Sequence, residues 1–82
     1  MTRIWTANGD VFEIVGMWWK RTRATMASCP HIPYEGAIIE IYPVEIGKPI
    51  IWSGFAIGDA EHVLILRSDV VVKIEDTTEM VN

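Results

Sequence analysis

The residues best suited to molecular recognition form one short run, in which two tryptophans are followed by three cationic side chains. Residues 18–23 read Trp-Trp-Lys-Arg-Thr-Arg. Indole rings stack on bases or fill pockets in a partner protein, and lysine and arginine bind phosphates or carboxylates. The run therefore predicts a partner-binding surface, whose aromatic and cationic members are Trp18, Trp19, Lys20, Arg21 and Arg23.

Two kinds of partner fit this run. Trp and Arg are the residue types most enriched at interface hot spots, which favours a protein partner. Stacking combined with phosphate contacts would instead bind single-stranded nucleic acid, which is the first alternative. Adjacent strand residues point to opposite faces, so one of Trp18 and Trp19 is expected inside and the other outside. A single outward indole in a chain of net charge −4 makes nucleic acid the weaker of the two interpretations.

Acidic residues supply the second alternative, a nucleic-acid-mimicking inhibitor. Residues 1–41 contain four basic and four acidic residues, whereas residues 42–82 contain three basic and seven acidic residues, so the second half carries the whole net charge. Carboxylates can imitate a phosphate backbone and steer a protein to a basic groove, although turns and wet sheet faces also need solubilising charges. The carboxylates of this alternative are Asp59, Glu61, Asp69, Glu75, Asp76 and Glu79.

Catalytic and metal chemistry find little support in the residues present. Cys29-Pro30-His31 and His62 supply three Cys and His side chains, one fewer than a structural zinc site uses, and a catalytic cysteine needs an oriented histidine. Glu13 and Glu40 could form an acid and base pair on neighbouring strands, but a small barrel has little cavity to desolvate them. We therefore expect no enzymatic activity, no cofactor and no metal.

The elements that position these residues are predicted to be strands, because apolar residues recur with period two and are mostly β-branched or aromatic. Asn8-Gly9 predicts a type I′ hairpin turn between strands 3–7 and 10–21, and Gly16 within the second strand predicts a bulge or a bend. The later strands are expected at 36–45, 50–57, 62–67 and 69–76.

Two of the later strands have distinctive patterns. Pro43 predicts that its strand ends at an edge or a bulge, because proline donates no ladder hydrogen bond. In the last strand, Val70, Val72 and Ile74 share one face, and charged residues occupy most of the other, so the valine face is expected to be buried. The pair Ser68-Asp69 is expected to form a tight bend or bulge before this strand.

Residues 22–35 follow neither period and contain two of the four prolines, so they are predicted to form one long irregular loop. Long loops on a rigid scaffold often carry binding residues. His31 and Tyr34 of this loop therefore join the predicted contact surface.

Together these elements indicate an all-β fold, namely a small antiparallel barrel or roll of the SH3-like or OB-like kind with about six short strands. We expect residues 1–75 to form a single β domain and residues 76–82 to form a flexible C-terminal tail. The lone Cys29 rules out an intramolecular disulfide, and the sequence has no signal-peptide pattern and no apolar run long enough to span a membrane. A cytoplasmic protein with no membrane partner is expected, and a homodimer would cover apolar surface and free strand edges.

The two ends of the β domain resemble small accessory proteins of phages and prophages. The opening run is Arg-Ile-Trp-Thr-Ala-Asn-Gly-Asp-Val-Phe-Glu-Ile, and the closing run is Leu-Arg-Ser-Asp-Val-Val-Val-Lys-Ile-Glu. In those proteins a Thr-x-(Ser/Asn)-Gly hairpin begins the chain, and a short valine-rich strand that starts with serine ends it. The resemblance implies a non-catalytic viral or mobile-element protein that binds and inhibits a host protein in the host cytoplasm.

Overall fold

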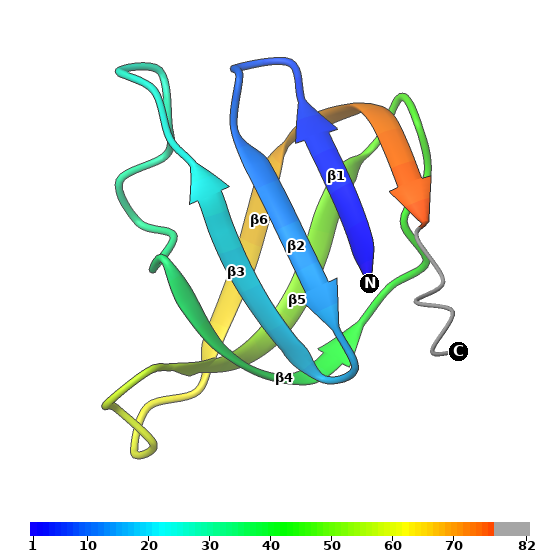
Figure 1. Cartoon of the computed structure of the whole chain (residues 1–82). Helices are drawn as coiled ribbons and strands as arrows, with labels where there is room; N and C mark the ends of the chain where they lie inside the picture. Colours follow the sequence, from blue (N-terminus) through cyan, green and yellow to red (C-terminus); the bar gives the residue numbers. More distant parts are fainter. Residues whose placement is uncertain (77–82) are drawn as a thin grey trace, which may run out of the picture.

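The computed structural model describes residues 1–76, which form six β-strands joined by turns and loops, without a helix (Figure 1). The strands are β1 (Thr2–Thr6), β2 (Val11–Val15), β3 (Trp18–Arg23), β4 (Glu35–Ile41), β5 (Pro49–Ala56) and β6 (Leu64–Asp76). Asp76, the first residue of the expected tail, belongs to β6, and the rest of that tail lies outside the described residues. No helix in the described part of the chain is long and apolar enough to cross a membrane.

The six strands form a closed antiparallel barrel. Each strand pairs with the next one in sequence, and β6 returns to pair with β1, where Ile4 lies opposite Ile74. The prediction of a small all-β antiparallel barrel is therefore confirmed, with the strand order of an up-and-down meander. Because every one of β1–β6 has two neighbours, the described strands leave no free edge, and the expectation of edges to cover is wrong.

The first hairpin differs from the expected type I′ turn. That turn needs positive φ at both central residues, yet only Gly9 is left-handed, at φ 92°. The Thr6 amide donates to the Asp10 carbonyl and the Gly9 amide donates to the Thr6 carbonyl, both at 3.0 Å. The side-chain oxygen of Asn8 accepts from the Asp10 amide at 3.2 Å, which holds Asn8 itself out of the left-handed region.

Two strand boundaries also differ from the sequence expectation. The predicted strand 10–21 is divided into β2 and β3, because Gly16 has φ 57° and reverses the chain instead of forming a bulge. The predicted strands 62–67 and 69–76 are continuous in β6. Ser68 makes this possible, because its Oγ accepts from the Ile50 amide at 2.8 Å and donates to the Asp69 carbonyl at 2.7 Å, so the bend is held within the sheet.

The predicted faces of the last strand are reversed at Val70, Val71 and Val72, whereas Ile74 keeps its predicted side and packs against the core. Val71 is 1% exposed and belongs to the core, whereas Val70 and Val72 are exposed, Val72 at 52%. The register of β6 shifts once against β5 and once against β1. Each extra residue moves the alternation by one position, so a simple period-two reading assigns the wrong face.

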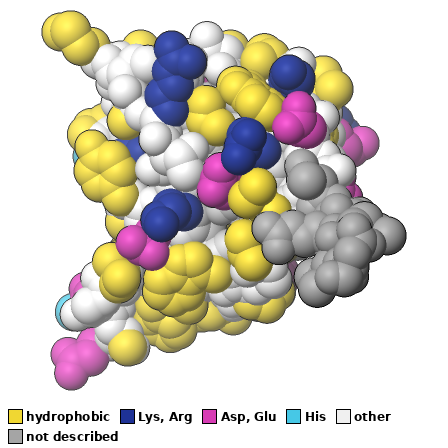
Figure 2. Space-filling model, in the orientation of Figure 1, with side chains coloured by type: hydrophobic (Ala, Val, Ile, Leu, Met, Phe, Trp, Pro, Cys, Tyr) yellow, Lys and Arg dark blue, Asp and Glu magenta, His cyan; other side chains and the backbone are white. Residues whose placement is uncertain are grey.

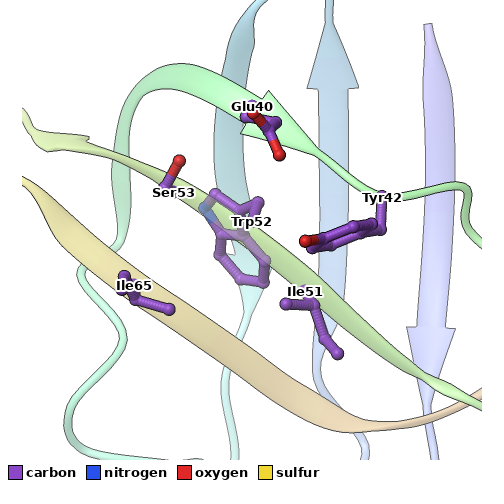
Figure 3. Close-up of a pocket in the computed structure, with 6 residues that line it drawn as sticks. All are labelled: Glu40, Tyr42, Ile51, Trp52, Ser53 and Ile65. Atoms are coloured by element: carbon purple, nitrogen blue, oxygen red, sulfur yellow. The ribbon is translucent and has the colours of Figure 1, made fainter.

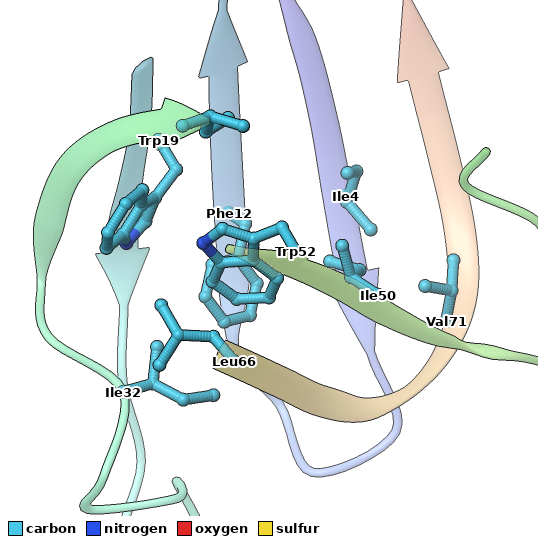
Figure 4. Packing of buried hydrophobic residues seen from close by; sticks show 9 residues of the cluster. Ile4, Phe12, Trp19, Ile32, Ile50, Trp52, Leu66 and Val71 are labelled. Atoms are coloured by element: carbon cyan, nitrogen blue, oxygen red, sulfur yellow. The ribbon is translucent and has the colours of Figure 1, made fainter. Parts of the chain in front are cut away.

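Three aromatic rings fill the centre of the barrel (Figure 4). The Trp19 and Trp52 rings meet edge to face with centroids 5.7 Å apart, and Phe12 meets Trp52 in the same way at 5.8 Å. Such T-shaped pairs add about 0.5–1.5 kcal/mol to the stability that area burial provides. The aliphatic part of this core consists of Ile4, Ile32, Ile38, Ile50, Leu66 and Val71.

Two glycines inside strands make room for Trp19. A Cβ on Gly36 would lie 1.9 Å from the Phe55 carbonyl oxygen and 2.4 Å from Trp19 Cη2, and a Cβ on Gly54 would lie 2.9 Å from Trp19 Cζ3. These glycines therefore let β4 and β5 close over the indole and serve neither turns nor bulges. Pro43 was expected inside the preceding strand but follows its last residue, Ile41.

Candidate functional site

Arg21 was expected on the contact surface, but its side chain is buried and holds the long loop in place. Its guanidinium donates from Nη2 to the Ile32 carbonyl at 2.9 Å and from Nη1 to the Cys29 carbonyl at 3.2 Å. The residue is 7% exposed, and its charge lies 4.8 Å from the centre of the Tyr34 ring. A partner therefore cannot reach this cation, and the prediction that Arg21 belongs to the binding surface is wrong.

Asp10 completes the buried polar cluster around Arg21, and sequence reasoning counted it only as a charge. Its Oδ2 lies 3.7 Å from Arg21 Nη1 and accepts from the Asn8 side-chain amide at 3.4 Å, while its Oδ1 accepts from the hydroxyl of Ser28. The loop between β3 and β4 is thus tied to the first hairpin as well as to Arg21. The loop covers one end of the barrel, where Ile32 is buried.

Trp18 and Trp19 point in opposite directions, as the alternation of a strand predicts. Trp19 is 1% exposed and belongs to the core, so it cannot meet a partner. Trp18 is 38% exposed, and its indole Nε1 donates to the Glu35 carboxylate at 3.0 Å. Of the two predicted aromatic anchors, only Trp18 faces solvent.

The other expected contact residues are exposed, but they do not gather in one place. Lys20 points outward from the middle of β3, and Arg23 lies at the end that leads into the long loop with His31 and Tyr34. Trp18 lies at the opposite end of the same strand (Figure 1).

Lys20 belongs to a row of alternating charges that crosses five strands. The row is visible in Figure 2 as a diagonal line of dark blue and magenta side chains. Cross-strand pairing sets its order, which is Glu75, Arg3, Glu13, Lys20 and Glu35. Opposite charges on neighbouring strands stabilise the sheet by a few tenths of a kcal/mol per pair, up to about 1 kcal/mol. Lys20 therefore faces a carboxylate on either side, and the described part of β3 does not present a continuous basic track for a nucleic-acid backbone.

The expected acidic set is also dispersed. Asp59 and Glu61 lie in the loop between β5 and β6, whereas Glu75 and Asp76 end the 13-residue strand β6. Asp69 lies at the bulge between these positions, and Glu79 lies outside the described residues. These carboxylates do not form one row on the described surface.

The structure also does not bring together the residues that were considered for acid–base or metal chemistry. Glu13 lies on β2 and Glu40 lies on β4, so the expectation that they sit on neighbouring strands is wrong. Cys29 is half-buried and His31 is exposed. Within residues 1–76, the structure brings together no group of three Cys, His, Asp or Glu residues that could hold a metal ion.

An apolar row runs beside the charged row on the outer wall of the barrel. Val15 pairs with Trp18, Trp18 pairs with Ala37, and Ala37 pairs with Phe55, so these four residues face outward on β2, β3, β4 and β5. Figure 2 shows a broad hydrophobic area below the charged diagonal. Because the members come from four strands, only the register of the closed sheet brings them together.

A groove of about 300 Å³ opens over this row. Its residues are Trp18, Ala37, Phe55, Ala56, Ile57, Gly58, Asp59 and Ala60. Ala37 is the smallest side chain of the row and lies between two aromatic rings, so it forms the floor of a slot. The chain segment 57–60, which follows β5, forms a wall of the groove.

This wall is held by a local hydrogen-bond network around Asp59. The Asp59 amide donates to the Ala56 carbonyl at 3.0 Å, and the Asp59 carboxylate lies 3.0 Å from His62 Nδ1 and accepts from the Glu61 amide at 3.3 Å. The hydrogen bond from His62 is the main reason that the pKa of Asp59 is below its ordinary value. The Asp59 carboxylate of the groove wall is therefore ionised at neutral pH, with His62 beside it.

A second hollow of about 190 Å³ lies further along the outer face of β5 (Figure 3). Its rim includes Glu40, Ser53 and Ile65, which are paired in register across β4, β5 and β6, and Tyr42 stands beside them. The register of β4 shifts between Ile38 and Glu40, next to this hollow. This hollow extends the partly apolar outer face beyond the groove at Phe55.

Comparison with known proteins gives no match among protein-family models, curated proteins or solved structures. The class of this protein is therefore defined by its fold and its groove alone. Residues 1–76 form a closed six-stranded antiparallel β-barrel with an aromatic groove on its outer wall. Among the groove residues, sequence analysis named Trp18 and, in the separate acidic set, Asp59. Nothing in the sequence marks Ala37 and Phe55 as neighbours of Trp18.

Proposed function

We propose that this chain is a non-catalytic protein-binding module whose contact site is the groove between Trp18 and Phe55. The observation that carries the proposal is the outward row of Val15, Trp18, Ala37 and Phe55. Single exposed apolar side chains are normal on protein surfaces, but a contiguous row beside an ordered loop is the kind of surface that marks interaction sites. Tryptophan in such a pocket is a typical hot-spot residue.

The proposed partner is a host protein that the chain inhibits by covering one of its surfaces. The resemblance of both terminal runs to phage accessory proteins supports this part of the proposal. The long loop supports it in another way, because Arg21 and Asp10 bind this loop to the barrel through buried polar contacts. A rigid scaffold loses little conformational entropy on binding.

The test begins with affinity capture from a bacterial lysate, after which the captured partner is purified and its affinity for this chain is measured by calorimetry. Trp18→Ala is expected to weaken binding at least about tenfold, as truncation of a buried interface tryptophan does. Met26→Ala is the matched control, because Met26 is a fully exposed apolar residue on the long loop. A purified partner that binds both variants as tightly as wild type, or that loses affinity only with Met26→Ala, contradicts the proposed site.

A further inference from the structure

The closed barrel limits how a partner segment can lie in the groove. Each of the strands β1–β6 already pairs on both sides, so a partner strand cannot extend the described sheet by ladder hydrogen bonds. The indole N–H of Trp18 is also engaged, with Glu35. An extended segment bound here must therefore keep its own backbone solvated, and polyproline II is the regular extended conformation that does so.

The shape of the groove favours a compact, rigid apolar side chain. Trp18 and Phe55 lie on strands β3 and β5, with Ala37 between them on β4. Two inter-strand spacings separate their backbones by about 10 Å, which leaves a slot about one ring wide above the Ala37 methyl group. A proline ring fills such a slot against aromatic faces, and it loses no side-chain rotamer entropy on burial.

The charges at the groove favour a basic neighbour for that proline. Asp59 lines the groove, and Glu35 lies beside Trp18, one carboxylate oxygen accepting from the indole. Lys20 pairs with Glu35 across the strands, and both residues lie outside the groove lining, where their opposite charges offset each other. A cationic side chain on the partner would therefore be attracted to Asp59, the carboxylate that lines the groove.

We infer that the groove between Trp18 and Phe55 binds a proline-rich partner segment in the polyproline II conformation, with lysine or arginine next to the prolines. This inference rests on the proposed protein-binding function and adds the chemical class of the bound segment. Trp18, Ala37 and Phe55 bind the prolines, and Asp59 attracts the cation.

The inference is tested by selecting from a displayed library of random linear peptides on the full chain. Ala37→Arg serves as the counter-target, because a long side chain on the solvent face would fill the slot. Met26→Arg is the matched control, because it adds the same side chain at a fully exposed position of the long loop, outside the groove lining, and thermal melts establish that both variants fold. We expect the wild type and Met26→Arg to select peptides that contain proline beside lysine or arginine, and Ala37→Arg to lose them.

Affinity measurements on a selected peptide complete the test. Replacing its prolines with alanine, or Trp18 with alanine in the protein, is expected to weaken binding at least about tenfold. Asp59→Asn is expected to weaken binding several-fold at low salt and less at high salt, because the carboxylate is exposed and screened. If Ala37→Arg does not fold, Trp18→Ala takes its place as the counter-target.

The possible failures separate the two proposals. Slot-dependent peptides that lack proline, or that carry acidic residues or a helical pattern, would overturn the inference and leave the protein-binding function standing. A library that yields no slot-dependent peptide also overturns the inference. The protein-binding function is then judged by the calorimetric measurement with the purified partner. That function is contradicted only if Trp18→Ala leaves the affinity for the purified partner unchanged.

Discussion

At the scale of single residues, alternation along β3 decides which side chains stabilise the barrel and which can meet a partner. Trp19 and Arg21 point inward, and Trp18 and Lys20 point outward. Arginine suits the inward position because its guanidinium presents several donors in one plane, and here two of them reach the Cys29 and Ile32 carbonyls. A residue type that is common at interfaces therefore serves here to order a loop.

Replacement of Arg21 is expected to destabilise the protein strongly. Arg21→Ala leaves Asp10 buried without its cationic partner and two carbonyls without their donors, which costs about 3–5 kcal/mol by analogy with other broken buried pairs. Urea denaturation of this variant and of Arg23→Ala, an exposed control expected to change stability by less than about 0.5 kcal/mol, checks the prediction. Equal unfolding midpoints for the two variants would show that Arg21 does not hold the loop.

The hydrogen bond between Asp59 and His62 predicts the acid behaviour of the groove wall. Because the pKa of Asp59 is lowered, its hydrogen bond with His62 stabilises the folded wall fully above the ordinary aspartate pKa of 3.8. This stabilisation is lost as the pH falls through the lower pKa that Asp59 has in the folded protein. Carboxyl carbon shifts measured by NMR should show Asp59 titrating below ordinary aspartate. His62→Ala should move that titration back up, and an unchanged midpoint in this variant would exclude the histidine as the cause.

At the scale of elements, β4 and β5 carry both the inner support of Trp19 and the outer groove. Gly36 and Gly54 face the Trp19 ring, whereas Ala37 and Phe55, one position further along each strand, face outward. The approach of the two strands over Trp19 thus depends on the glycines. The same pairing register brings Ala37 opposite Phe55.

Gly36→Ala is expected to destabilise the barrel by at least about 3 kcal/mol, at or above the upper end for overpacking. Its new Cβ would lie 1.9 Å from the Phe55 carbonyl oxygen, which belongs to the backbone and cannot rotate away. Loss of unfolded-state entropy through the extra methyl group offsets only about 0.4–1 kcal/mol of this. Thermal melts followed by circular dichroism measure the change, with Ala37→Ser as the neighbouring control. A Gly36→Ala melt as high as that of the control would contradict this account.

At the scale of the whole molecule, closure of the sheet by β1 and β6 governs both stability and the ways in which the protein can associate. Pairing around the full circle removes the free edges that were one reason to expect a homodimer. The outward apolar row is one of the exposed apolar surfaces that remain for association. A partner must therefore bind through side chains on the barrel wall, which is the geometry that the proposed function uses.

Closure also predicts uniform protection of backbone amides from hydrogen exchange. The hydrogen-bonded amides of β1 and β6 should exchange about as slowly as those of β2 and β5, because strand pairing continues between β1 and β6. Exchange followed by NMR at neutral pH measures this directly. Fast exchange confined to β1 and β6 would indicate an open sheet.

Much of the fold was predictable, since period-two patterning and turn residues act locally. They identify the all-β class, the hairpin at Asn8-Gly9 and the opposite directions of Trp18 and Trp19. The predicted count of six agrees with the structure because the division of strand 10–21 and the joining of strands 62–67 and 69–76 cancel. The reversed faces at Val71 and Val72 were not predictable, because bulges in β6 depend on how its neighbours pair. The burial of Arg21 was not predictable either, because its acceptors are backbone carbonyls of the irregular loop that follows β3.

The amino-acid sequence by itself determined an all-β domain without a disulfide, and it marked Trp18 as one of two candidate anchors. Only the tertiary structure decided that the sheet closes and that Trp18, Ala37 and Phe55 form one groove. The physical reason is that alternation is a property of neighbouring residues, whereas register is set by packing and hydrogen bonding between strands far apart in the chain.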